Sequence, residues 1–254
     1  MIQAHHIHFL ALPLSLRMVY TMTLLVLGLG YLFAMIHIFD SHAGRDGDAS
    51  LSVQDLMIAY SGSESDTRLE SALKGPMQSM LPAEEANQII AWVRSGAEQA
   101  AFDKDIASIV ESRCITCHNG SNPHIPNLKE FSELSKLVEK DTGMDIFTLV
   151  RVSHIHLFGI TFIFFITSVI YTHSHVRPLW FKCIVIVVPF LTIIFDILSW
   201  YLTKLWTPFA WVVLISGAFM GLSFAIQAAT SLYQMWLYKL PADLEASGGK
   251  LPHM

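Results

Sequence analysis

Four long apolar runs constrain the fold of this 254-residue chain more than any other feature. They cover roughly residues 18–39, 147–172, 181–202 and 209–237. A helix needs about 20 apolar residues to cross the hydrocarbon core of a bilayer. With 53% hydrophobic and 15% charged residues, the chain also has the composition of a membrane protein. We therefore predict an all-α protein with four transmembrane helices.

The polar stretch between the first two runs is long enough to form a domain of its own. The sequence predicts an N-terminal segment with the first transmembrane helix (1–43), an inserted domain (44–145), transmembrane helices 2–4 (146–237) and a C-terminal tail (238–254). We expect the tail to be disordered from Ser247 onward. Apolar periodicity predicts helices in the inserted domain over residues 53–60, 82–95 and 102–113.

Basic residues flank the apolar runs unequally. One set of ends carries Arg17, Arg177, Lys182 and Lys239, whereas the opposite ends carry Arg151 and Lys204. Because basic residues concentrate on the cytoplasmic side, we expect both termini in the cytoplasm and the inserted domain outside. A cleaved signal peptide is the alternative for the first run, but this run is longer than the usual apolar core of about 7–15 residues. We expect a retained anchor.

The inserted domain contains the run Cys114-Ile115-Thr116-Cys117-His118. A zinc site would need a second pair of ligands, and the third of the three cysteines, Cys183, lies far away in or beside an apolar run. A redox C-x-x-C motif would need a βαβ context, which the sequence does not indicate. The spacing places two thiols and an imidazole on one short turn.

This run resembles the haem-attachment sequence of c-type cytochromes. The resemblance implies a covalent haem c on Cys114 and Cys117, with His118 as an axial ligand of the iron. It also implies that the carbonyl of Pro126 accepts a hydrogen bond from His118 and orients the imidazole. The resemblance covers the inserted domain and none of the membrane part.

The order of the pieces departs from that family. A ligand methionine and a terminal helix normally follow the motif, whereas here Met80-Leu81-Pro82 and the helix after it come first. We expect Met80 to be the sixth ligand. Its competitors are Met57, Met77, Met144 and His124.

Ionisable residues within membrane spans are costly and mark functional sites. In the expected orientation, the outer half of the bilayer contains His37, His154, His156 and Asp196. At about 100° per residue, His154 and His156 point to nearly opposite faces. One interpretation is a haem b held by His37 with His154 or His156, with Asp196 as a hydrogen-bond acceptor for a histidine. Copper, a quinol site, or histidines that only pack or lie at headgroup level are the alternatives.

The resemblance implies a membrane-bound c-type cytochrome that transfers electrons at the outer, periplasmic face of a bacterial cell membrane. We expect a subunit of a larger redox complex, not a stand-alone enzyme, which relays electrons from a membrane haem b or quinol. Its expected partners are other membrane redox subunits, a soluble periplasmic electron carrier and membrane lipid. A net charge of −5 without a basic cluster argues against nucleic acid. The alternatives are a structural, assembly or haem-sensing subunit, and a haem enzyme with an open sixth position.

Overall fold

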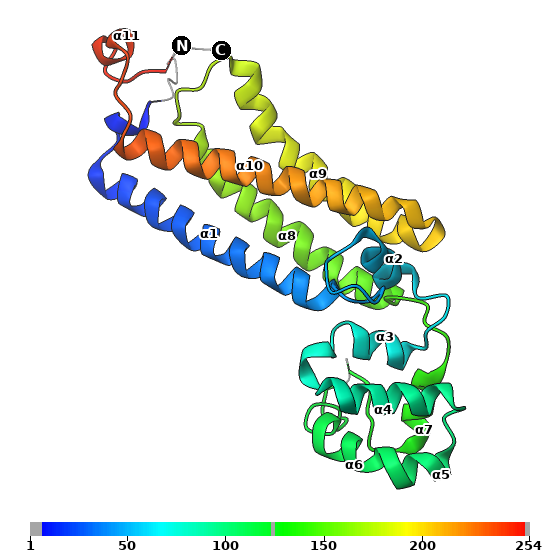
Figure 1. Ribbon diagram of the computed structural model, residues 1–254. Helices are drawn as coiled ribbons and strands as arrows, with labels where there is room; N and C mark the ends of the chain where they lie inside the picture. The colour runs from blue at the N-terminus through cyan, green and yellow to red at the C-terminus, as the bar shows by residue number, and fades with distance from the viewer. Residues whose placement is uncertain (1–6, 123–124, 252–254) are drawn as a thin grey trace. The chain divides into compact units, whose positions relative to one another are not determined.

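The computed structural model describes residues 7–122 and 125–251, and this part of the chain is helical apart from turns and isolated β-bridges (Figure 1). This confirms the all-α prediction. The longer helices are α1 (Leu14–His42), α2 (Val53–Ser61), α3 (Arg68–Lys74), α4 (Ala83–Arg94), α8 (Ile146–Tyr171), α9 (Leu179–Leu205) and α10 (Ala210–Trp236). The short elements are η1 (Phe9–Ala11), η2 (Gln78–Met80), α5 (Gln99–Ala101), η3 (Phe102–Ile106), α6 (Ala107–Ile109), η4 (Val110–Cys114), α7 (Phe131–Ser135), η5 (Lys136–Val138), η6 (Thr207–Phe209) and α11 (Ala242–Ala246).

The chain forms two compact units. The membrane unit comprises Met1–Met35, Phe147–Leu202 and Trp211–Met254, and the inserted unit comprises Ile36–Ile146 and Thr203–Ala210. The inserted unit is therefore larger than the predicted segment 44–145, because it includes the last turns of α1 and α9.

Four helices are long and apolar enough to cross a membrane: Leu14–His42, Ile146–Tyr171, Leu179–Leu205 and Thr207–Trp236. They coincide with the four predicted runs to within a few residues. In their most apolar windows only 6% to 33% of residues are buried inside the protein. The remaining apolar side chains need a non-aqueous environment, so the chain is a multi-pass membrane protein.

A buried amide links three of the membrane helices. Gln227 of α10 is fully buried, its Oε1 accepts a hydrogen bond from Ser168 of α8 (3.3 Å), and its Nε2 donates to the carbonyl of Val185 in α9 (2.9 Å). Pro189 lies four residues after Val185 and has no N–H for the usual helical bond to that carbonyl. Gln227 therefore supplies the donor that Pro189 lacks.

Replacing Gln227 with leucine is expected to destabilise the helix bundle by roughly 0.6–1.7 kcal/mol, the range for hydrogen bonds between membrane helices. In a Pro189→Ala background the loss should be smaller, because residue 189 then has its own N–H for Val185. Unfolding in mixed detergent micelles measures both values. Equal losses of stability in the two backgrounds would contradict the assignment of Gln227 as the donor that replaces the N–H of Pro189. Ser168→Ala is the control for the other hydrogen bond of Gln227.

The first and last described segments of the chain meet in the membrane unit. The N–H of His8 donates to the carbonyl of Gly249 (2.8 Å), and Ile7 forms a bridge with Lys250. The prediction of disorder from Ser247 onward is therefore wrong up to Leu251, which is buried. His8 is fully buried, and its Nε2 donates to Oε1 of Gln234 (3.0 Å).

The core of the inserted unit is built around Trp92. Its ring contacts Phe102 (5.6 Å between centroids) and Phe131 (6.3 Å), and its Nε1 donates to the carbonyl of Glu98 (3.1 Å). The other buried core residues are Leu69, Leu73, Ile89, Val93, Ile106, Val110, Leu128 and Leu134. The predicted helices 53–60 and 82–95 are α2 and α4, and the predicted helix 102–113 is part of a helical stretch from Gln99 to Cys114 with two π-helical segments.

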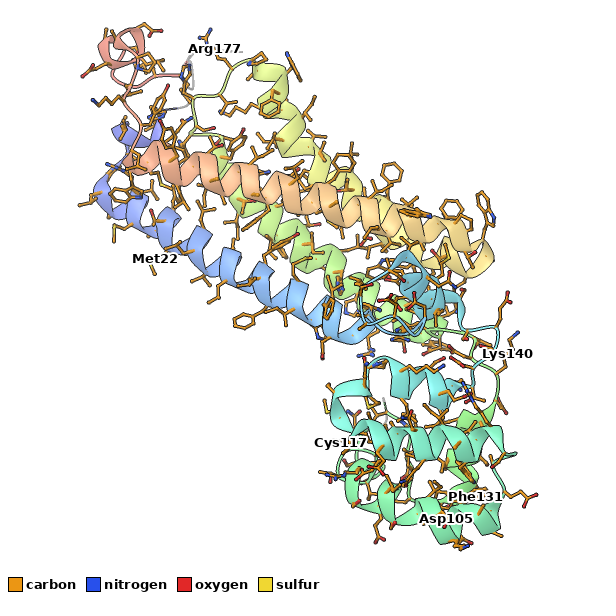
Figure 2. All side chains as sticks on the ribbon, viewed as in Figure 1. Met22, Asp105, Cys117, Phe131, Lys140 and Arg177 are labelled. Atoms are coloured by element: carbon orange, nitrogen blue, oxygen red, sulfur yellow. The ribbon has the colours of Figure 1, made fainter. Side chains whose placement is uncertain are left out.

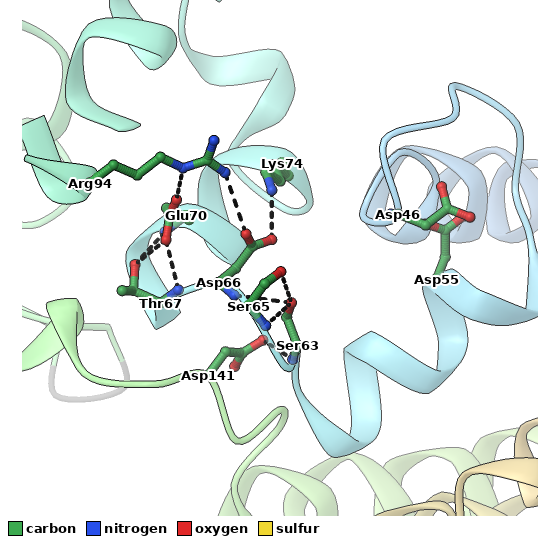
Figure 3. A network of polar contacts seen from close by, with 10 residues as sticks. All are labelled: Asp46, Asp55, Ser63, Ser65, Asp66, Thr67, Glu70, Lys74, Arg94 and Asp141. Atoms are coloured by element: carbon green, nitrogen blue, oxygen red, sulfur yellow. Dashed lines mark hydrogen bonds and ion pairs between the residues drawn. The ribbon is translucent and has the colours of Figure 1, made fainter. Parts of the chain in front are cut away.

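A network of ion pairs joins α3 to α4 in this unit (Figure 3). Arg94 at the end of α4 binds Glu70 (2.8 Å), and Asp66 binds Lys74 (2.6 Å). Glu70 also closes a capping box with Thr67 at the start of α3. Burial raises the pKa of Glu70, but the hydrogen bonds from Thr67 and Arg94 outweigh it, so the net effect is a lowered pKa. The network therefore links the C-terminal end of α4 to α3.

Candidate functional site

The Cys114–His118 run lies at the end of the helical stretch that crosses the core. Ile106 and Val110 face the core at a spacing of four residues, and Cys114 continues that row at its edge. The chain then turns, since the N–H groups of Cys117 and His118 both donate to the carbonyl of Cys114 (3.2 and 2.8 Å). Both cysteines are free thiols, Cys114 half-buried and Cys117 exposed. Figure 2 labels Cys117 in the inserted unit. The thiol of Cys114 is therefore held at the edge of the core, whereas the thiol of Cys117 is accessible.

A single hydrogen bond orients the imidazole of His118. Its Nδ1 lies 2.8 Å from the carbonyl oxygen of Pro126. Because a carbonyl only accepts, Nδ1 carries the hydrogen and Nε2 keeps its lone pair. The N–H of Leu128 donates back to the carbonyl of His118 (2.9 Å), and the Leu128 side chain is buried in the core. This is the contact between His118 and Pro126 that the resemblance implies, whereas iron ligation stays a prediction.

The two thiols differ in their surroundings. Burial raises the pKa of Cys114, and the negative charge of Glu85 raises it further. Arg113 holds Glu85 in place through two hydrogen bonds of 2.9 Å. Cys114 is therefore kept as a neutral thiol and is a poor nucleophile at neutral pH.

The donor set fits a covalently attached haem. Among the described residues, no three His, Cys, Asp or Glu side chains come together closely enough to hold a metal ion. A haem needs no such group, because the porphyrin supplies four ligands and the protein only the axial ones. Two free thiols and an imidazole with an unshared Nε2 satisfy its attachment requirements.

The structure separates the predicted sixth ligands. Met80 is 65% exposed at the end of η2, whereas its neighbours Met77 and Leu81 pack against the core. Met57 lines a polar cleft, and the N–H of Met144 donates to the carbonyl of Ala59 (3.0 Å). Neither of these two methionines packs in the cluster that contains Cys114. His124 lies outside the described residues.

The two histidines of α8 lie on different faces, as their spacing predicts. His154 is exposed, whereas the half-buried ring of His156 meets the ring of Trp200 in α9 edge-on (5.2 Å, 82°). Nδ1 of His156 donates to the carbonyl of Val152 (2.9 Å). His37, in α1, is exposed and lies 3.3 Å from the hydroxyl of Ser41. The pairing of His37 with His154 or His156 stays a prediction.

Asp196 is the buried carboxyl group of the membrane unit. It is 6% exposed and contacts the side chain of Trp200, one turn further along α9. Within the described residues, no ion pair joins Asp196 to His156. Sequence reasoning missed Trp200, which contacts both residues. Its only sequence signal is its spacing of four residues from Asp196.

The comparisons with known proteins concern the membrane part. The model of a family described as a transmembrane helical domain (Aq_1264_TM) matches residues 143–242, which contain α8, α9 and α10. No curated protein and no solved structure matches the chain. The membrane part is thus similar to a known transmembrane domain, which supports a multi-pass membrane protein. The haem-type motif lies outside the matched residues.

Proposed function

We propose that this chain is a membrane-bound c-type cytochrome whose inserted unit carries one covalent haem and transfers electrons. The observation that carries the proposal is the 2.8 Å hydrogen bond from Nδ1 of His118 to Pro126, one turn from two free thiols. The bound haem would supply one-electron chemistry between ferric and ferrous iron.

The residues of the motif have separate tasks in this proposal. Cys114 and Cys117 tether the haem, and Nε2 of His118 ligates the iron. The hydrogen bond to Pro126 fixes the ring and raises its basicity. Met80 is the proposed sixth ligand. Cys114 packs against the core around Trp92, and this core excludes water from that side of the motif.

The proposal places the inserted unit in the periplasm of a bacterial cell and both termini in the cytoplasm. The basic residues that flank the spans support this orientation. Lys204 is a basic residue at the opposite, outer ends of the spans and so departs from this bias. Its ammonium group has a separate role, because it donates hydrogen bonds to three backbone carbonyls. Other membrane redox subunits and a soluble electron carrier are the proposed partners.

Expression in a bacterium that matures c-type cytochromes tests the proposal. We expect haem to stay on the chain after denaturing electrophoresis, with one haem c per chain in the pyridine haemochrome assay. Cys114→Ser/Cys117→Ser should lose this haem completely, whereas Cys183→Ser should keep it. Haem-free protein from a host that loads a known c-type cytochrome would refute the proposal. Carbon monoxide binding without denaturation would instead indicate an enzyme with an open sixth position.

A further inference from the structure

The segment 7–12, which contains η1, is held at one end of the membrane unit by distant parts of the chain. The N–H of His8 donates to the carbonyl of Gly249 in the tail (2.8 Å). Nδ1 of His173, in the loop between α8 and α9, donates to the carbonyl of Ile7 (2.8 Å). The segment is therefore docked against both the tail and this loop.

The imidazole of His8 is fixed by hydrogen bonds at both of its nitrogens. The amide of Gln234 in α10 pairs with the backbone of His175: its Oε1 accepts from the N–H (2.6 Å), and its Nε2 donates to the carbonyl (2.9 Å). This pairing turns Oε1 toward His8, so Oε1 accepts a hydrogen bond from Nε2 of His8 (3.0 Å). Nδ1 of His8 accepts a hydrogen bond from the N–H of Leu10 (3.2 Å). His8 is thus docked as a neutral imidazole with its hydrogen on Nε2.

This arrangement does not suit a protonated His8. The second proton would be on Nδ1 and would point at the N–H of Leu10, which is itself a donor. The cap of η1 would be lost. Because the His8 side chain is fully buried, water could not take the place of the lost partner.

The charges near His8 oppose protonation as well. Burial lowers the pKa of His8, the hydrogen bond with Gln234 raises it, and the positive charges of His175, His173 and Lys182 lower it further. The titratable groups on the surrounding elements are Arg17 and Tyr20 of α1, His173, His175 and Arg177 of the loop, Lys182 of α9, Tyr238 after α10, and Asp243, Glu245 and Lys250 of the tail. The two acids of this set are exposed on α11, where solvent and salt screen their charges.

The two neighbouring histidines can take up a proton without losing the hydrogen bonds of their Nδ1 atoms. Nδ1 of His173 donates to the carbonyl of Ile7 in either charge state. Nδ1 of His175 lies 3.1 Å from the hydroxyl of Tyr238, which can accept as well as donate. Of these three histidines, His8 is the one whose ring hydrogen bonds require the neutral form.

We propose that His8 is a pH-sensitive switch, which docks the segment 7–12 against the tail when neutral and releases it when Nδ1 is protonated. Release would separate Ile7 from Lys250 and expose Phe9, which is fully buried in the docked state. The inference does not depend on the haem. In the proposed orientation this end of the membrane unit lies in the cytoplasm, so the switch would respond to cytoplasmic pH.

The direction of the pH dependence follows from the proton count. Docked His8 is neutral, whereas released His8 has the ordinary histidine pKa of about 6.5. Release therefore takes up one proton below that pH. Docking is fully stable above about pH 6.5 and weakens roughly tenfold for each pH unit below it, until docked His8 is itself protonated.

Hydrogen exchange of the full-length protein in detergent micelles tests the switch. After correction for the intrinsic exchange rate, the segment 7–12 should lose protection roughly tenfold between about pH 7.5 and about pH 5.5. His8→Asn should remove this pH dependence, because an asparagine oxygen can still cap the N–H of Leu10 but does not titrate. His175→Asn is the matched control from the same cluster and should keep the pH dependence.

Several results would overturn the proposal. One is the same pH dependence in His8→Asn as in wild type, and another is a pH dependence that disappears in His175→Asn instead. If His8→Asn is already undocked at high pH, a nuclear magnetic resonance titration of wild-type His8 decides. A midpoint below about 6.5 with the hydrogen on Nε2 supports the switch, whereas a midpoint at or above that value, or a hydrogen on Nδ1 of the neutral ring, refutes it. Neither measurement reads the haem, so failure here leaves the proposed function intact.

Discussion

Replacing Lys204 with methionine is expected to destabilise the inserted unit by roughly 2–4 kcal/mol, because it leaves several backbone carbonyls without a donor. Lys204 belongs to the last turn of α9. Its Nζ donates to the carbonyls of Tyr60 (2.9 Å), Thr142 (2.8 Å) and Met144 (2.8 Å). All three hydrogens of the ammonium group are thus used.

The three carbonyls converge because two chain segments cross backbone to backbone. Gly62 (φ +90°) and Gly143 (φ +69°) lie at the crossing, and a Cβ atom at either position would collide with the backbone of the other segment. Side chains cannot fill such a crossing, so the exposed carbonyls need an external donor. Lys204 provides it from a segment at least 60 residues away in sequence.

Hydrogen exchange measures this effect at the crossing itself. The amide of Asp141 donates to Asp66, and the amide of Met144 donates to Ala59, both at 3.0 Å. In Lys204→Met we expect both amides to lose protection by the factor that corresponds to the lost stability. Lys129→Met removes an exposed charge from the same unit and should leave protection unchanged. Unaltered protection in Lys204→Met would show that the three hydrogen bonds of Lys204 do not stabilise the crossing.

Sequence reasoning located the features that depend on composition and local order. The length of each apolar run identifies the four membrane helices, and Pro82 with Glu84 and Glu85 identifies the start of α4. The resemblance of the run Cys114–His118 to c-type cytochromes implied the contact between His118 and Pro126 that the structure contains. These features are readable because their partners lie close in sequence.

The features that were missed have partners far away in sequence. Lys204 was counted as a charge beside a membrane span, because nothing near it in sequence reveals its three carbonyls. Gln227 and Pro189 lie in different apolar helices, and their relation depends on the register between α9 and α10, which the sequence does not reveal. The helix α3 is an exception, since the capping box of Thr67 and Glu70 marks its start in the sequence.

The largest spectroscopic effect is expected from Met80→Ala. A methionine ligand to ferric haem gives a weak near-infrared charge-transfer band and raises the reduction potential relative to a histidine ligand. Met80 is 65% exposed, whereas Met77 packs against the core, and the assignment of Met80 as ligand stays a prediction. A side chain that faces away from its own core is free to meet a cofactor bound at the motif.

Met80→Ala should therefore abolish the band, lower the reduction potential by on the order of 100 mV, and let ferrous haem bind carbon monoxide. Met77→Ala is the matched control: it should keep the band and lose stability instead, because it removes a side chain that packs against the core of the inserted unit. If the band survives in Met80→Ala and disappears in Met77→Ala, the ligand is Met77, and η2 must then rearrange when haem binds. If it survives in both variants, neither methionine is the ligand.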